Sequence, residues 1–175
     1  MKLQTLFTRL GKSQEFIEFK QKNAEAFFCT GFFVLNFKQN IFEYSLDYRD
    51  DKKLYAFRVP TEEKEKILFT TEDLIENPKP MEKIDEDAIK NLKADIEDIK
   101  EIVEQAIWDN NIKNSLEEVI AVLQCMNGKI VWNMTCICSS LSVVNVNINP
   151  FTGDVTKFEK KNLLDFATVK KVDKK

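Results

Sequence analysis

Apolar and polar residues alternate along much of the chain, which is the pattern of strands with one buried face. The alternation is clearest over residues 141–149, where Val144, Val146 and Ile148 are separated by asparagines. We predict strands wherever this alternation or a short run rich in β-branched and aromatic residues recurs. These segments are 26–37, 41–48, 54–59, 67–69, 129–138, 141–149 and 154–158.

Residues 115–126 carry conflicting signals. Ser115 and Glu118 have the spacing of a capping box, which favours a helix. Three β-branched residues within the segment favour a strand instead. Asn127-Gly128 follows, and this dipeptide is the strongest short signal for a hairpin turn. We therefore predict a strand here, paired with the strand at 129–138.

Helical periodicity is strong in one segment and modest in another. Apolar residues recur at spacings of three and four from Ile89 to Ala106, which predicts an amphipathic helix over about Asp85 to Trp108, with Asp85 as its N-cap. Residues 3–22 have weaker periodicity. There we expect Ser13 to begin a helix and Gly11 to end any earlier one.

The run Asn77-Pro78-Lys79-Pro80 is the clearest break in the chain, and it separates residues 1–76 from residues 81–175. Each part is predicted to contain a helix, three strands and a short extra strand. The first has its own aromatic core, because 11 of the 14 phenylalanines lie in the first 69 residues. The predicted fold class is α+β: an antiparallel sheet with helices packed on one face, in two similar halves.

A weak internal match is consistent with a duplicated unit. Residues 44–47 (YSLD), a turn, Leu54 and Phe57 align with residues 146–149 (VNIN), a turn, Val155 and Phe158, after one insertion. The alternative is two unrelated hairpins with similar turn chemistry. Both interpretations stay open at the level of sequence.

Composition and charge exclude several classes of protein. The net charge is −3, and the one basic stretch is the C-terminal 157–175, so no nucleic-acid partner is expected. No apolar run approaches the roughly 20 residues of a membrane span, and the first residues lack the apolar core of a signal peptide. We therefore expect no membrane partner and a cytoplasmic location.

The sequence provides little for catalysis. Histidine is absent, which removes His-based triads and His-containing zinc sites. The four glycines are isolated, so no phosphate-binding loop is formed, and no pair of acids stands out from the 29 present. We predict a non-catalytic protein with no cofactor.

Cysteine spacing leaves one weaker alternative. Cys136 and Cys138 lie two apart in a predicted strand and share a face, but the second pair that a metal site needs is missing. A thiol or metal function of Cys136 and Cys138 is therefore the weaker alternative to four buried, reduced thiols.

A polar, uncharged sheet face is the candidate binding site. It is predicted to contain the residues Asn133, Thr135, Asn145, Asn147 and Asn149. Exposed together, these side chains make a surface rich in hydrogen-bond donors and acceptors, suited to a protein or peptide partner or to a second subunit. The alternative is that they form the hydrated side of an antiparallel sheet. Trp132, on the opposite face, is expected in the core.

Residues 84–160 resemble a PepSY-type domain. The resemblance rests on the alternating run from Val144 to Asn149, followed by the Thr152-Gly153 turn and Val155, with Asn149 at the position of the family's Asp. It implies a helix followed by a three-stranded antiparallel sheet. PepSY modules are usually extracytoplasmic and often accompany peptidases as inhibitory or binding modules. The whole chain also looks like uncharacterised archaeal proteins with a two-part layout.

Taken together, residues and resemblance predict a non-catalytic module that binds a protein or peptide. A structural protein that associates with itself as a homodimer is the alternative.

Overall fold

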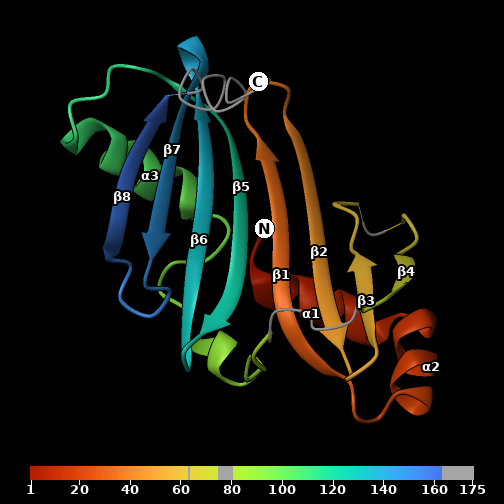
Figure 1. The fold of residues 1–175 in the computed structure, drawn as a ribbon. Helices are drawn as coiled ribbons and strands as arrows, with labels where there is room; N and C mark the ends of the chain where they lie inside the picture. Colours follow the sequence, from red (N-terminus) through yellow and green to blue (C-terminus); the bar gives the residue numbers. More distant parts are fainter. Residues whose placement is uncertain (63, 75–80, 163–175) are drawn as a thin grey trace, which may run out of the picture.

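The computed structural model describes residues 1–62, 64–74 and 81–162 (Figure 1). Its α-helices are α1 (Leu3–Lys12), α2 (Gln14–Lys22) and α3 (Ile99–Asp109), with short 3-10 helices η1 (Ala88–Asn91) and η2 (Ser139–Leu141). Its strands are β1 (Phe27–Asn36), β2 (Ile41–Arg49), β3 (Lys53–Arg58), β4 (Leu68–Asp73), β5 (Leu116–Met126), β6 (Lys129–Cys138), β7 (Ser142–Ile148) and β8 (Val155–Asn162).

All eight strands form one antiparallel sheet in the order β4-β3-β2-β1-β5-β6-β7-β8. Chain neighbours are sheet neighbours within β1–β4 and within β5–β8, and β1 pairs with β5 at the centre, where Val34 lies opposite Ile120. Residues 1–76 and 81–175 thus each contribute four strands to a continuous sheet. The predicted α+β class with an antiparallel sheet is confirmed.

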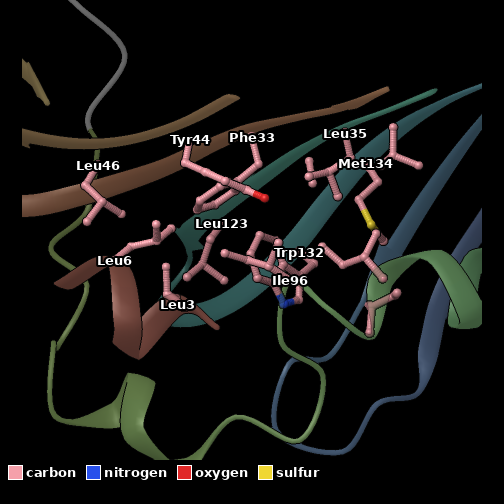
Figure 2. Packing of buried hydrophobic residues seen from close by; sticks show 14 of the residues in the cluster. Leu3, Leu6, Phe33, Leu35, Tyr44, Leu46, Ile96, Leu123, Trp132 and Met134 are labelled. Atoms are coloured by element: carbon pink, nitrogen blue, oxygen red, sulfur yellow. The ribbon is translucent and has the colours of Figure 1, made fainter. Parts of the chain in front are cut away.

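One face of the sheet carries the core. Trp132, Met134 and Cys136 of β6 are fully buried, whereas the residues between them are half-buried. Leu3 and Leu6 of α1 pack against this face in the same apolar cluster, and Figure 2 shows them beside Leu46, Leu123 and Trp132. In Figure 1, α1 and α3 lie behind the sheet, and Phe19 of α2 belongs to the same apolar cluster, so none of these three helices lies on the opposite face.

Close packing of aromatic rings explains the glycine in β1. A Cβ on Gly31 would come within 2.7 Å of the Phe33 ring, so a larger residue at this position would displace that ring. The Phe33 ring in turn meets Trp132 with centroids 5.5 Å apart, edge to face. This contact joins the aromatic first half to the second half in one core.

The single helix predicted over about Asp85 to Trp108 is wrong. The segment forms η1, then a connection of bends and turns over residues 92–98, then α3. The backbone N–H groups of Lys93 and Ala94 both donate to the Pro150 carbonyl, at 2.9 and 3.0 Å, and the buried Trp132 indole donates to the Ala94 carbonyl. These tertiary hydrogen bonds replace helical ones, while the apolar residues of the segment still reach the core.

Several local predictions are confirmed. Residues 115–126 form a strand, and the turn to β6 has positive φ at Asn127 (52°) and Gly128 (73°), as a type I′ turn requires. Ser13 is the N-cap of α2, accepting from the Phe16 N–H at 3.2 Å. Gly11, however, lies inside α1 and does not end it. The edge strands β4 and β8 are longer than predicted.

The break at residues 77–80 and the C-terminal part of the basic stretch, 163–175, lie outside the described residues.

Candidate functional site: the open face of the sheet

The helix-free face of the sheet carries a regular array of side chains. The strand registers place Phe32, Val122, Asn133 and Asn147 in one row across β1, β5, β6 and β7. The next row across the same strands contains Val34, Ile120, Thr135 and Asn145. We call these eight residues the open-face patch. It is apolar on β1 and β5 and polar on β6 and β7.

The apolar half is centred on Phe32, whose side chain is 41% exposed in the middle of a central strand. Val34, Ile120 and Val122 beside it are half-buried. The sequence analysis missed these residues because the dense apolar run of β1 suggested burial on both faces. Phe32 and Phe33 are consecutive and point to opposite faces of the sheet, but this alternation alone does not show which of the two faces is exposed.

The polar half is a small ladder of amide and hydroxyl groups. Asn133 lies directly opposite Asn147, and Thr135 lies opposite Asn145. Residues paired in this way have Cβ atoms about 5 Å apart, within reach of a common ligand group. In the described parts of the chain, no group hydrogen-bonds to these four side chains, so their donors and acceptors remain available for a partner.

Asn149, the fifth predicted residue, has a different role. It follows the end of β7, beyond a register shift between Asn147 and Ile148. Its Oδ1 accepts from the Phe151 N–H at 2.9 Å, and its own N–H donates to the Asp154 carbonyl. The side chain thus stabilises the turn into β8. The structure brings four of the five predicted residues together and leaves Asn149 outside the open-face patch.

Charged residues border the open-face patch without entering it. The first row continues to Ser45 on β2 and Lys157 on β8, and the second to Glu43 and Glu159 on the same strands. Asp47, farther along β2, accepts a 2.6 Å hydrogen bond from Ser45 Oγ. Burial raises the pKa of this carboxyl to about 6, and nearby Glu72 acts in the same direction.

The two cysteines of the weaker alternative lie in the core. Cys136 and Cys138 share the buried face of β6, as their spacing predicted. Burial raises the pKa of Cys136 to about 12 and that of Cys138 above its ordinary value. Within residues 1–62, 64–74 and 81–162, no cluster of three or more Cys, Asp or Glu side chains is arranged to hold a metal ion. The geometry offers no support for thiol or metal chemistry.

Trp132 is fully buried, as expected, and its Nε1 donates to the Ala94 carbonyl at 2.8 Å. The exposed tryptophan is Trp108, in the last turn of α3, with 77% of its surface accessible.

Comparison with known proteins supports the fold but indicates no function. No protein-family model and no curated protein sequence matches the chain. Among solved structures, the chain is similar to the crystal structure of a putative lipoprotein from Clostridium difficile 630, with a TM-score of 0.53 and 17% identity. The likeness covers 84% of this chain and 90% of that one.

None of the helices in the described residues combines the length and the apolar character needed to cross a membrane.

Proposed function

We propose that this protein is a non-catalytic module that binds a protein or peptide on the open-face patch. One observation carries the proposal: four polar side chains, without hydrogen bonds to other described residues, lie beside an exposed phenylalanine on a face that none of the helices α1, α2 and α3 covers. Apolar and hydrogen-bonding groups side by side are typical of protein interfaces, where aromatic residues provide area and polar groups provide orientation.

The composition of the open-face patch also restricts the chemistry of the partner. The patch contains no ionisable side chain, so a charged group placed over its centre would lose water without gaining a counter-ion. The preferred partner is an uncharged segment with apolar side chains toward Phe32 and Ile120. Its backbone or side-chain amides would meet Asn133 and Asn147.

The PepSY-type resemblance is retained as part of this proposal. The helix and three antiparallel strands that it implies would be α3 and β5–β7, and modules of that family often accompany peptidases as inhibitory or binding modules. The likeness of the two halves also remains a proposal. Chain order makes β2 equivalent to β6, whereas the internal sequence match aligns the β2–β3 hairpin with the β7–β8 hairpin. Chain order and topology, rather than that match, support a duplicated unit.

The cellular compartment is likewise a proposal. The sequence favours the cytoplasm, and the C. difficile neighbour is described as a putative lipoprotein. Fractionation of source cells, followed by detection of the native protein in cytosol or membrane, separates the two.

The test is a double variant, Asn145→Lys/Asn147→Lys, used beside the native chain to capture partners from a lysate of the source organism. Both positions are half-buried on a hydrated face, so the variant should fold normally, as circular dichroism would verify. The control is Gln21→Lys/Gln39→Lys, which adds the same charge at exposed positions in α2 and in the β1–β2 turn.

A partner that binds the native chain and the control but not the open-face variant supports the proposal. A photo-crosslinking residue at position 32 should then form a covalent adduct with that partner, and the same residue at position 21 should not. A partner retained by all three proteins would contradict the proposal and place its site elsewhere on the molecule.

A further inference from the structure

The two edges of the sheet differ in how they are protected. At one edge, β4 pairs with β3 and with no other strand in the described ranges. All six of its residues are exposed, including Leu68 at 59% and Phe69 at 42%. The outer side of β4 therefore presents a row of backbone N–H and C=O groups without strand partners, beside large apolar side chains.

Proteins usually guard such edges with lysines, prolines or bulges. The opposite edge, β8, follows this rule: it contains Lys157, Lys160 and Lys161 within eight residues. The β4 sequence, Leu-Phe-Thr-Thr-Glu-Asp, contains no lysine or proline, and its register with β3 is regular along its whole length. The chemistry of β4 is that of a strand able to accept another strand.

The charge distribution of β4 fits a second copy of the same strand. In an antiparallel pair about a twofold axis perpendicular to the sheet, one residue faces its own copy. With Thr70 on the axis, Glu72 faces Leu68 of the other copy, and with Thr71 on the axis, Glu72 faces Thr70. In both registers a threonine pair lies at the centre and no two acids are opposed, an arrangement that favours pairing.

We propose that two copies of this chain associate through β4, joining their sheets edge to edge. The aromatic packing of the strand gives it the rigidity that pairing needs: Phe69 stacks on Phe57, with centroids 4.8 Å apart and planes within 23°. Because the twofold axis is perpendicular to the sheet, both open-face patches lie on the same side of the dimer and stay uncovered. The inference is independent of the function proposed for that patch.

Sedimentation analysis of the full chain tests the proposal, by measuring mass against protein concentration. The expected result is a shift from 20.4 kDa toward twice that mass as concentration rises. Six-residue strands make a small interface, so the dissociation constant should lie between about 1 μM and 1 mM. The variant Thr70→Glu/Thr71→Glu opposes like charges in either register: position 70 faces its own copy in one, and in the other position 71 faces its own copy while position 70 faces Glu72. It should weaken association at least tenfold.

The matched control is Val155→Glu/Thr156→Glu, which adds the same charge to the β8 edge and should leave the dissociation constant unchanged. Amide hydrogen exchange of the native chain provides a second readout that needs no variant: exchange across residues 68–73 should slow as concentration rises. A native chain that stays monomeric up to 1 mM (roughly the weak limit above), or a dimer insensitive to the β4 substitutions, would overturn the proposal.

Discussion

The backbone N–H of Leu3 donates a 2.8 Å hydrogen bond to Asp95 Oδ1, across 92 residues of sequence. Leu3 is the first residue of α1, and Asp95 lies in the connection of bends and turns between η1 and α3. The same carboxylate oxygen accepts from the Ile96 N–H at 2.7 Å. A carboxylate at the start of α1 satisfies a backbone donor and interacts favourably with the helix dipole, so the second half of the chain stabilises a helix of the first.

Replacement of Asp95 by alanine should therefore destabilise the whole protein. Both N–H groups lose their acceptor, and we expect the free energy of unfolding to fall by about 1 to 2 kcal/mol. Urea unfolding followed by circular dichroism measures it. Glu104→Ala, at an exposed position of α3, is the control and should change stability by less than about 0.5 kcal/mol. Equal effects of the two substitutions would contradict the assignment of Asp95 as a cap.

Trp132→Phe should be more damaging. The substitution leaves a cavity in the core and removes the donor for the buried Ala94 carbonyl, at a cost of about 2 to 4 kcal/mol. Trp108→Phe, at the exposed end of α3, should be nearly neutral. Native tryptophan fluorescence gives a second check: the blue-shifted, quencher-protected component should disappear in Trp132→Phe and persist in Trp108→Phe.

Asp47 should make stability depend on pH. Burial raises its pKa from 3.8 to about 6, so the folded state binds the proton more tightly than the unfolded state. Its contribution to the free energy of unfolding is consequently largest below the unfolded pKa and falls as pH rises through the interval between the two values. Asp47→Asn should stabilise the protein at neutral pH, by up to about 3 kcal/mol.

The measurement for Asp47 is urea unfolding at a series of pH values, with Asp51→Asn at an exposed turn position as the control. The asparagine variant at position 47 should lose most of the pH dependence that the control retains. A native-like slope in Asp47→Asn would show that the carboxyl titrates at its ordinary pKa.

Two glycines should respond in opposite directions to alanine. Gly128 has a φ of +73° in the β5–β6 turn, where an L-residue is strained, so Gly128→Ala should destabilise by about 1 to 2 kcal/mol. Gly11 lies inside α1, and a Cβ added there would have no atom within 4 Å, so Gly11→Ala should stabilise by up to about 1 kcal/mol. Thermal unfolding of both variants decides the point, and a destabilised Gly11→Ala would contradict the helical assignment.

Short-range sequence patterns were sufficient to predict a helix or strand wherever one of its faces is buried and the other is not. The alternation around Val144, Val146 and Ile148 correctly predicted β7 and its core face, and the buried side of Trp132 followed from the same parity. The Asn127-Gly128 turn was predictable because few other residues tolerate positive φ at both turn positions. The polar half of the open-face patch followed directly from these registers.

The apolar half of the open-face patch could not be predicted from the sequence. Strand β1 is apolar on both faces, so the alternation of its residues does not show which face meets solvent. Only the placement of α1, α2 and α3 on one side of the sheet decides that Phe32 is exposed while Phe33 is buried. Asn149 differs from the other four predicted residues because β7 ends at Ile148, and the Asn149 side chain accepts from the Phe151 N–H within the turn that follows.

By itself the sequence determined the strands, the turn chemistry and an α+β fold, because these depend on neighbours a few residues apart. The tertiary structure decided that β1 pairs with β5 to make one sheet, that η1 and α3 are separate helices, and that β4 is an exposed edge. Each depends on contacts between residues far apart in the chain, such as the Ala94 carbonyl with Trp132, and such contacts leave no periodic signal in the sequence.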